Sequence, residues 1–70
     1  MKVTTVSKRI GRRIRQIREE KGITQEDLAG EAGLNRAYVG YIERGERNPS
    51  TSTLEKIAKS LKVALKDLFR

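Results

Sequence analysis

The sequence predicts an all-α fold, a compact bundle of five short helices in one domain. Apolar residues recur every three or four positions along the chain, which is the spacing of one helix face. Glycine or proline separates these stretches, and the helix-capping residues Ser, Thr and Asn precede most of them. A length of 70 residues suits a single small domain with a modest core.

The first helix is predicted to run from about Ser7 to Lys21. Ser7 can cap it by accepting a hydrogen bond from an amide of the first turn, and Gly22 can end it in the left-handed conformation. Its apolar stripe is Ile10, Ile14 and Ile17, and its opposite face carries Lys8, Arg9, Arg12, Arg13 and Arg15. This basic face is solvated by default, and its N-terminal end is the better candidate for flanking a phosphate backbone.

Two short helices joined at a glycine follow. Thr24 can cap a helix over about residues 25–32, with Asp27 completing an Asp variant of the capping box, and Asn35 can cap a helix over about residues 36–43. Ala29 and Gly33 lie where the two helices are expected to approach closely, and Gly33 ends the first. This layout is that of a helix-turn-helix, whose second helix enters the major groove of DNA.

The remainder of the chain is predicted to form a loop and two more helices. Gly45 is expected to end the helix over 36–43 in the same way as Gly22. The loop ERNPS contains the only proline, a fourth helix begins at Ser50 or Thr51, and a short fifth helix follows Val63. The inward-facing residues predicted for the second to fourth helices are Leu28, Ala29, Ala32, Val39, Ile42, Leu54, Ile57, Ala58 and Leu61.

The chain is strongly basic, with a formal net charge of +7 and an isoelectric point near 10.3. This charge is typical of nucleic-acid-binding proteins, although many small basic proteins are simply soluble. Eight basic and two acidic residues give residues 1–21 a net charge of +6. One basic and four acidic residues give 22–43 a charge of −3, and seven basic and three acidic residues give 44–70 a charge of +4. Basic charge therefore flanks the predicted helix-turn-helix.

The residue types that most enzymes use are missing. The chain has no His and no Cys, the usual ligands and bases of metal sites and of Ser/His or Cys/His catalysis. Neighbouring carboxylates on a helix point about 100° apart and do not face each other as an acid–base pair. We therefore expect no enzyme activity, no cofactor, no metal and no small-molecule ligand. Neither a signal sequence nor a membrane span is visible, so the predicted location is cytoplasmic.

A family resemblance lies in the stretch KGITQEDLAGEAGLNRAYVGYIERGERNPSTSTLEKIAKSLKV. Its motifs are TQEDLA, a glycine after that short helix, and IERG at the end of the next helix. The stretch resembles the XRE-like helix-turn-helix family of lambdoid phage repressors and Cro proteins. Within that family it is similar to restriction–modification controller proteins and small stand-alone bacterial regulators. The resemblance implies one lambda-repressor-like DNA-binding domain over residues 1–70, with the recognition helix at about 36–43.

The N-terminal ends of the two short helices carry the first candidate DNA contacts. Gln25 lies at a helix N-terminus, which favours an anion. The resemblance implies that Gln25 holds a phosphate, and the alternative is an ordinary helix former. Arg36 opens the recognition helix, where its planar group can pair with guanine O6 and N7. Ala37 can touch a thymine methyl or merely permit close approach, and Asn35, the predicted cap, belongs to the same surface.

The rest of the recognition helix and the loop after it carry further candidates. Tyr38 and Tyr41 can each bond a phosphate or a base edge, or cover the core with the hydroxyl left in water. Tyr38 matches the controller-like pattern of Arg, small residue and Tyr, whereas Tyr41 occupies a variable position of the family. The resemblance places Arg44, Arg47 and Asn48 along the phosphate backbone, with Arg47 also able to reach bases. The alternative is a solvated polar loop.

Two further groups are expected to be structural. The resemblance implies a partly buried ion pair between Arg18 and Glu43, joining the first helix to the end of the third. The last helix and the loop before it form the predicted dimer interface, because a helix this short cannot bury all of these apolar residues in its own domain. Its residues are Val63, Leu65, Leu68 and Phe69. If some of these are core instead, Leu68 is the first to be reassigned.

These features predict a sequence-specific, double-stranded-DNA-binding transcriptional regulator, a homodimer on a palindromic operator, as a restriction–modification controller would be. Repression and activation both stay open. Glu26, Asp27 and Glu31 make the second helix acidic, and some relatives touch RNA polymerase there. The simpler interpretation is that these acids favour the helix N-terminus. Two alternatives remain: an antitoxin-type DNA binder whose main partner is a toxin, and an interaction module for an acidic protein or RNA.

Overall fold

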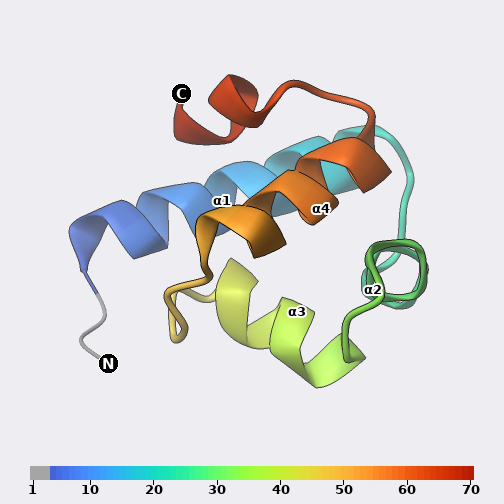
Figure 1. Cartoon of the computed structure of the whole chain (residues 1–70), viewed down its shortest axis with the longest axis horizontal. Coiled ribbons are helices and arrows are strands. Elements are labelled where there is room, and N and C mark those ends of the chain that lie inside the picture. The colour runs from blue at the N-terminus through green and yellow to red at the C-terminus, as the bar shows by residue number, and fades with distance from the viewer. Residues whose placement is uncertain (1–3) are drawn as a thin grey trace.

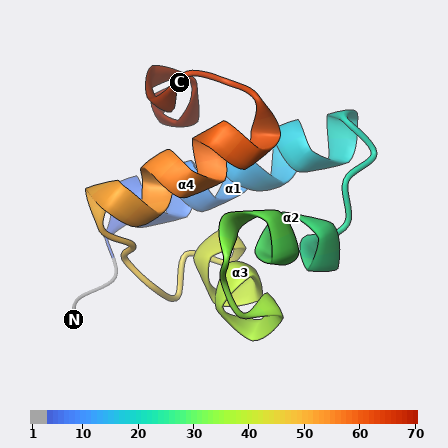
Figure 2. The ribbon, with the colours of Figure 1, turned by 45° about the vertical axis from the view of Figure 1, so that its right-hand side comes forward.

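The computed structural model describes residues 4–70 of the chain. Within that range it contains the α-helices α1 (Thr5–Glu20), α2 (Gln25–Ala32), α3 (Arg36–Glu43) and α4 (Thr51–Leu61), and the 3₁₀ helix η1 (Leu65–Phe69). η1 packs against α1 and α4, on the side away from α2 and α3 (Figure 1, Figure 2). The all-α prediction is confirmed. The fifth helix is a 3₁₀ helix, the form that short terminal segments often adopt.

The predicted starts of α2 and α3 are confirmed by their caps. The Thr24 hydroxyl accepts a hydrogen bond from the Asp27 amide at 3.0 Å, and the Asp27 carboxylate accepts one from the Thr24 amide at 3.3 Å. Asn35 Oδ1 accepts a hydrogen bond from the Ala37 amide at 2.7 Å. Each cap satisfies an amide that the helix leaves without an intrahelical partner. The two helices therefore begin where their local sequence requires.

The start of α1 corrects the prediction. Thr4 has an extended backbone and accepts a hydrogen bond from the Ser7 amide at 3.1 Å, so Thr4 is the cap. Ser7 lies inside the first turn and is buried, and the prediction that it caps this helix is wrong. Thr and Ser cap helices about equally well. The sequence alone therefore does not separate a start at Thr4 from a start three residues later.

The core is formed by apolar residues from all five helices. The residues predicted to face inward are buried, which confirms the helical periodicity on which the prediction rested. The core cluster comprises Ile10, Ile14, Ile17, Leu28, Ala29, Val39, Ile42, Leu54, Ile57, Ala58, Leu61 and Leu68. Within residues 4–70, no helix is both long enough and apolar enough to span a bilayer.

Glycines serve two different purposes in this fold. Gly22, Gly33 and Gly45 have φ of +70°, +68° and +73°, and each ends a helix as predicted. The close helix approach predicted at Gly33 is not found, because a Cβ there would meet no heavy atom within 4 Å. The close approach occurs instead at Gly11 in α1. A Cβ there would meet the carbonyl oxygens of the last two residues of α3, that of Glu43 at 2.8 Å.

Candidate nucleic-acid interface

The short turn after α2 leaves one face of α3 exposed. Val39 and Ile42 are each 1% exposed and fix α3 to the core. Arg36 and Ala37, in the first turn of α3, are exposed, as is the cap Asn35. The first turn of a recognition helix is the part that reaches base edges in the major groove. These three residues are therefore exposed at the position where a recognition helix contacts bases.

A buried ion pair joins α1 to α3. Arg18 Nε donates to Glu43 Oε2 at 2.6 Å and Arg18 Nη2 donates to Glu43 Oε1 at 3.0 Å, while Nη1 donates to the Ile23 carbonyl at 2.8 Å. The two side chains are only 10% and 2% exposed. The hydrogen bond to Glu43 raises the pKa of Arg18 above its ordinary value, so the guanidinium stays charged. The expected ion pair is thus formed, and the bond to Ile23 extends it to the α1–α2 turn.

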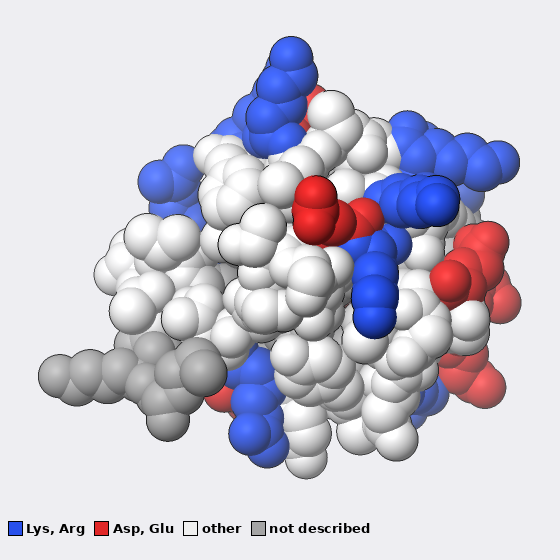
Figure 3. All heavy atoms as spheres, viewed as in Figure 1, with Lys and Arg blue, Asp and Glu red and all other residues white. Residues whose placement is uncertain are grey.

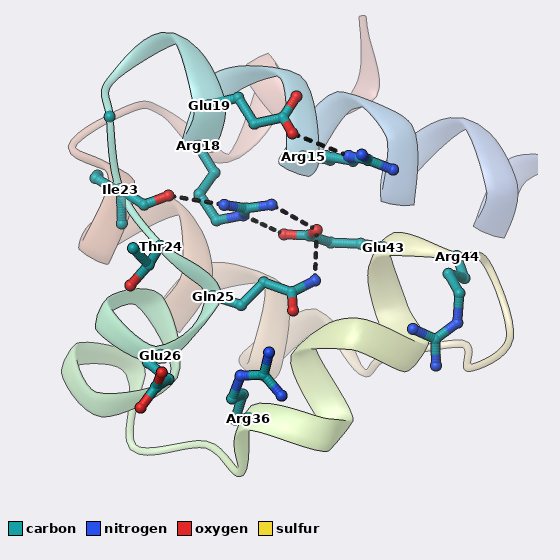
Figure 4. A pocket seen from close by; sticks show the side chains of 11 residues that line it. Arg15, Arg18, Glu19, Ile23, Thr24, Gln25, Glu26, Arg36, Glu43 and Arg44 are labelled. Carbon is teal, nitrogen blue, oxygen red and sulfur yellow. Dashed lines mark hydrogen bonds and ion pairs between the residues drawn. The ribbon is translucent and has the colours of Figure 1, made fainter.

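Gln25, the first residue of α2, joins the same network. Its Nε2 donates to Glu43 Oε1 at 3.0 Å. Figure 4 shows its carboxamide oxygen turned away from Glu43 and toward Arg36. Glu43 therefore binds α1 and α2 at once and fixes the orientation of the Gln25 amide. The hydrogen bond to Glu43 orients the Gln25 side chain. Its contact with a phosphate stays a prediction.

An open polar depression surrounds Gln25 (Figure 4). Arg15, Arg36 and Arg44 lie at its rim, together with the backbone at the start of α2. Arg15 pairs with Glu19 at 3.2 Å, whereas Arg36 makes no ion pair within residues 4–70. Glu19, Glu26 and Glu43 also line the depression, and the first and last of these are paired with Arg15 and Arg18. An anionic group such as a phosphate would therefore fit best beside Arg36 and the amides at the start of α2.

The exposed face of α3 ends in a cluster of one aromatic ring and two arginines. Tyr41 is 36% exposed, and the guanidinium carbons of Arg44 and Arg47 lie 5.3 and 5.0 Å from its ring centroid. Both distances are in the range of a cation–π interaction. Arg44 Nε also donates to Glu46 Oε2 at 3.1 Å, and this bond raises the pKa of Arg44. The structure thus brings three predicted DNA contacts together.

Tyr38 fits one of the two interpretations that the sequence left open, that of a ring covering the core. Its ring is half-buried and packs against the core. It also lines a small surface depression with Glu46, Arg47 and Asn48. Glu46 was not among the predicted site residues, although its place between two candidate arginines was a signal in the sequence. Tyr38 and Asn48 remain predicted contacts, now located beside a carboxylate.

Part of the basic face of α1 faces away from α3. Arg13 Nε donates to the Asp67 carbonyl at 2.9 Å, and Arg9 Nη2 donates to the Phe69 carbonyl at 3.4 Å. Cations stabilise the carbonyl end of a helix. These two arginines therefore hold η1 rather than standing free on a solvated face. The contacts span 54 and 60 residues of sequence, so no local pattern could have revealed them.

The residues predicted for a dimer interface divide into two groups. Leu68 has no exposed surface and belongs to the core, which removes it from the predicted interface. It is buried because η1 packs this side chain between α1 and α4. Val63 and Leu65 are half-buried against the core, and Phe69 is 47% exposed. Phe69, with the exposed parts of Val63 and Leu65, forms the apolar surface that remains.

Charge is unevenly distributed over the surface. In the view of Figure 3, acidic side chains gather on the side occupied by α2, and basic side chains lie above them. Glu26, Asp27 and Glu31 of α2 are exposed, but Asp27 also completes the α2 cap. The cap supports the simpler interpretation of that acid, and the contact with RNA polymerase stays a prediction.

The fold and this surface define a helix-turn-helix DNA-binding protein. Residues 14–68 match the helix-turn-helix family HTH_3, and the chain belongs to this family. The protein is accordingly a DNA-binding regulator and not an enzyme.

Several relatives are control proteins. C.BamHI of Bacillus amyloliquefaciens is 51% identical over 60 residues, which are 84% of this chain and 74% of that protein. C.MunI of Mycoplasma sp is 40% identical over 62 residues, 87% of this chain and 84% of that protein. The restriction–modification controller protein C.AhdI from Aeromonas hydrophila superimposes with a TM-score of 0.88 at 43% identity, over 90% of this chain and 96% of that one. The chain thus resembles these controllers in sequence and in fold.

Proposed function

We propose that this protein regulates transcription by binding double-stranded DNA sequence-specifically, as a homodimer on a palindromic operator, in the manner of a restriction–modification controller. The observation that carries the proposal is the exposed first turn of α3. Arg36 extends from it and makes no ion pair with any residue of 4–70, while Val39 and Ile42 fix the helix to the core. Similarity to C.BamHI and C.AhdI supports this kind of regulator.

A homodimer follows from the size of the surface. One recognition helix contacts a short part of one major groove, which is too little for tight and selective binding. Two copies related by a two-fold axis read half-sites about 34 Å apart. Phe69, with Val63 and Leu65, supplies apolar surface for pairing. Binding then depends on protein concentration, because the dimer forms as the protein accumulates.

Selection from a random duplex library tests the proposal directly. The protein is incubated with the library at moderate salt, and the retained duplexes are sequenced. We expect a palindrome with fixed half-site spacing. Retention that depends on salt but enriches no sequence would leave only non-specific attraction to the basic chain and would contradict the proposal.

A pair of conservative variants tests the role assigned to Arg36. Arg36→Lys keeps the charge and removes the planar fork that pairs with guanine. We expect it to lose about 1–3 kcal/mol of discrimination at one operator position. Arg12→Lys is the matched control, because Arg12 is exposed on α1 and makes no ion pair within residues 4–70. Equal selectivity of the two variants would remove Arg36 from base recognition.

A further inference from the structure

The backbone of Glu46 is fixed to the end of α3. Gly45 has φ of +73°, its amide donates to the Ile42 carbonyl at 3.0 Å, and the Glu46 amide donates to the Tyr41 carbonyl at 2.8 Å. This is the pattern of a Schellman motif, which ends a helix and sets the direction of the chain after it. The point from which the Glu46 side chain leaves the backbone is therefore determined by α3.

The Glu46 carboxylate lies among the predicted DNA contacts. It accepts the hydrogen bond from Arg44 Nε at 3.1 Å, and it lines a depression with Tyr38, Arg47 and Asn48. The Glu46 and Arg44 side chains are each 53% exposed. The other acidic residue of the range 36–48 is Glu43, which is buried in the ion pair with Arg18. Glu46 is thus the exposed negative charge of this described segment.

A carboxylate in this position repels phosphates but can form hydrogen bonds with the amino groups of bases. It only accepts hydrogen bonds, and a phosphate offers only acceptors and negative charge. A phosphate that approaches Arg44 must compete with Glu46 for the guanidinium and is repelled by the carboxylate. In the major groove, by contrast, cytosine N4 and adenine N6 are donors, and cytosine N4 is the usual partner of a glutamate.

We propose that Glu46 is a specificity-determining residue. It weakens binding to any duplex that presents only phosphates beside Arg44, and it accepts a hydrogen bond from a base amino group of the operator, cytosine N4 foremost. The inference rests on the sequence-specific DNA binding proposed above. Glu46 therefore acts on the ratio of two affinities, because it penalises the wrong partner as well as contacting the right one.

Two charge-matched variants test the inference. Glu46→Gln and Glu55→Gln each remove one negative charge and keep the side-chain size. Glu55 is exposed on α4 and makes no ion pair within residues 4–70. Dissociation constants are measured over a salt series for the duplex that the unmodified protein enriches most and for a shuffled duplex of the same composition. Circular dichroism verifies that each variant is folded.

We expect Glu46→Gln to bind the shuffled duplex more tightly, with a log–log salt slope steeper by up to about 0.9, the contribution of one phosphate. Its preference for the enriched duplex falls severalfold, because the repulsion of phosphates is lost while the carboxamide oxygen of Gln can still accept a hydrogen bond from a base amino group. Glu55→Gln shifts both affinities alike and keeps the ratio. If the unmodified protein discriminates and both variants keep that ratio, the role of Glu46 is refuted alone. If the unmodified protein binds both duplexes equally, the proposed function fails, and this inference fails with it.

Discussion

α1 supports two surfaces of the molecule by different interactions. Toward α3, Gly11 allows the two backbones to approach closely, and Arg18 forms a buried bidentate pair with Glu43. Toward η1, the core side chain Leu68 is buried, and at the surface Arg9 and Arg13 donate hydrogen bonds to the carbonyls of Phe69 and Asp67. The junction between α1 and α3 is buried and its ion pair is bidentate. The hydrogen bonds between α1 and η1 are exposed or only partly buried.

The difference indicates how rigid each surface is. Buried, doubly bonded charges have one low-energy arrangement, whereas exposed hydrogen bonds exchange readily with water. Segments with few buried contacts also open at lower free energy than the core. We therefore expect the candidate DNA-binding face to be preorganised before binding. The C-terminal surface, carried by η1, is expected to open first.

The largest expected effect comes from removing one partner of the buried pair. Glu43→Ala leaves the Arg18 guanidinium buried without its carboxylate and removes the acceptor of Gln25. We expect the free energy of unfolding, measured by urea denaturation, to fall by about 3–5 kcal/mol. The double variant Arg18→Met with Glu43→Leu should recover most of this loss. A loss under about 1 kcal/mol would mean that the site is hydrated and the comparison of the two junctions is wrong.

The second effect tests the close approach of α1 and α3. Gly11→Ala places a methyl group against the carbonyl oxygens at the end of α3 and should destabilise the fold by about 1–3 kcal/mol, as overpacking does. Gly30→Ala is the matched control, because Gly30 is exposed in α2 and a Cβ there meets no heavy atom within 4 Å. That substitution should stabilise the protein by about 0.5–1 kcal/mol. Thermal unfolding that responds equally to both changes would contradict the close approach.

The third effect concerns the weaker junction. Arg13→Met removes the hydrogen bond to the Asp67 carbonyl and should cost about 1 kcal/mol. We expect the loss to appear as faster hydrogen exchange of the η1 amides, with the amides of α3 unchanged. Arg12→Met, one position earlier and exposed, should leave both sets of amides unaffected. Exchange that rises equally in α3 and η1 would show that the two junctions open together.

The smallest effect is expected at an exposed ion pair of α1. Arg15 and Glu19 lie four residues apart, and their side chains are 61% and 56% exposed. Arg15→Met should therefore lower stability by only about 0.3–0.5 kcal/mol. The difference should disappear in high salt, which screens exposed pairs. A loss that persists at high salt would indicate a role in packing.

The sequence predicted the parts of this fold that depend on neighbouring residues. Thr24 and Asn35 specify the starts of α2 and α3 through hydrogen bonds that span two or three positions. The apolar periodicity identified the core for the same reason. The site residues on α3 followed from these starts, and the pairing of Arg18 with Glu43 came from the family resemblance.

The start of α1 was a local failure, because Thr4 and Ser7 are about equally good caps. The other features that the sequence did not predict depend on contacts between distant segments. In the sequence, Arg13 does not differ from the other arginines on the basic helix face. Its partner, the Asp67 carbonyl, lies 54 residues further along the chain. The close packing at Gly11 could have been suspected from the sequence. A glycine inside a helix costs about 1 kcal/mol relative to alanine and often marks close packing. The sequence still does not name the helix that it meets. The role proposed for Glu46 depends on its hydrogen bond with Arg44, which the backbone at the end of α3 determines.

The separation between the two faces of α3 has a consequence for how such a protein changes over time. Its inner face holds the fold, whereas Arg36, Ala37 and Tyr41 are exposed and contribute little to the core. Substitutions at these positions alter the chemistry offered to a partner without disturbing the packing beneath. Descendants of one ancestral chain can therefore acquire new targets through a few surface changes, while every intermediate along the way still folds.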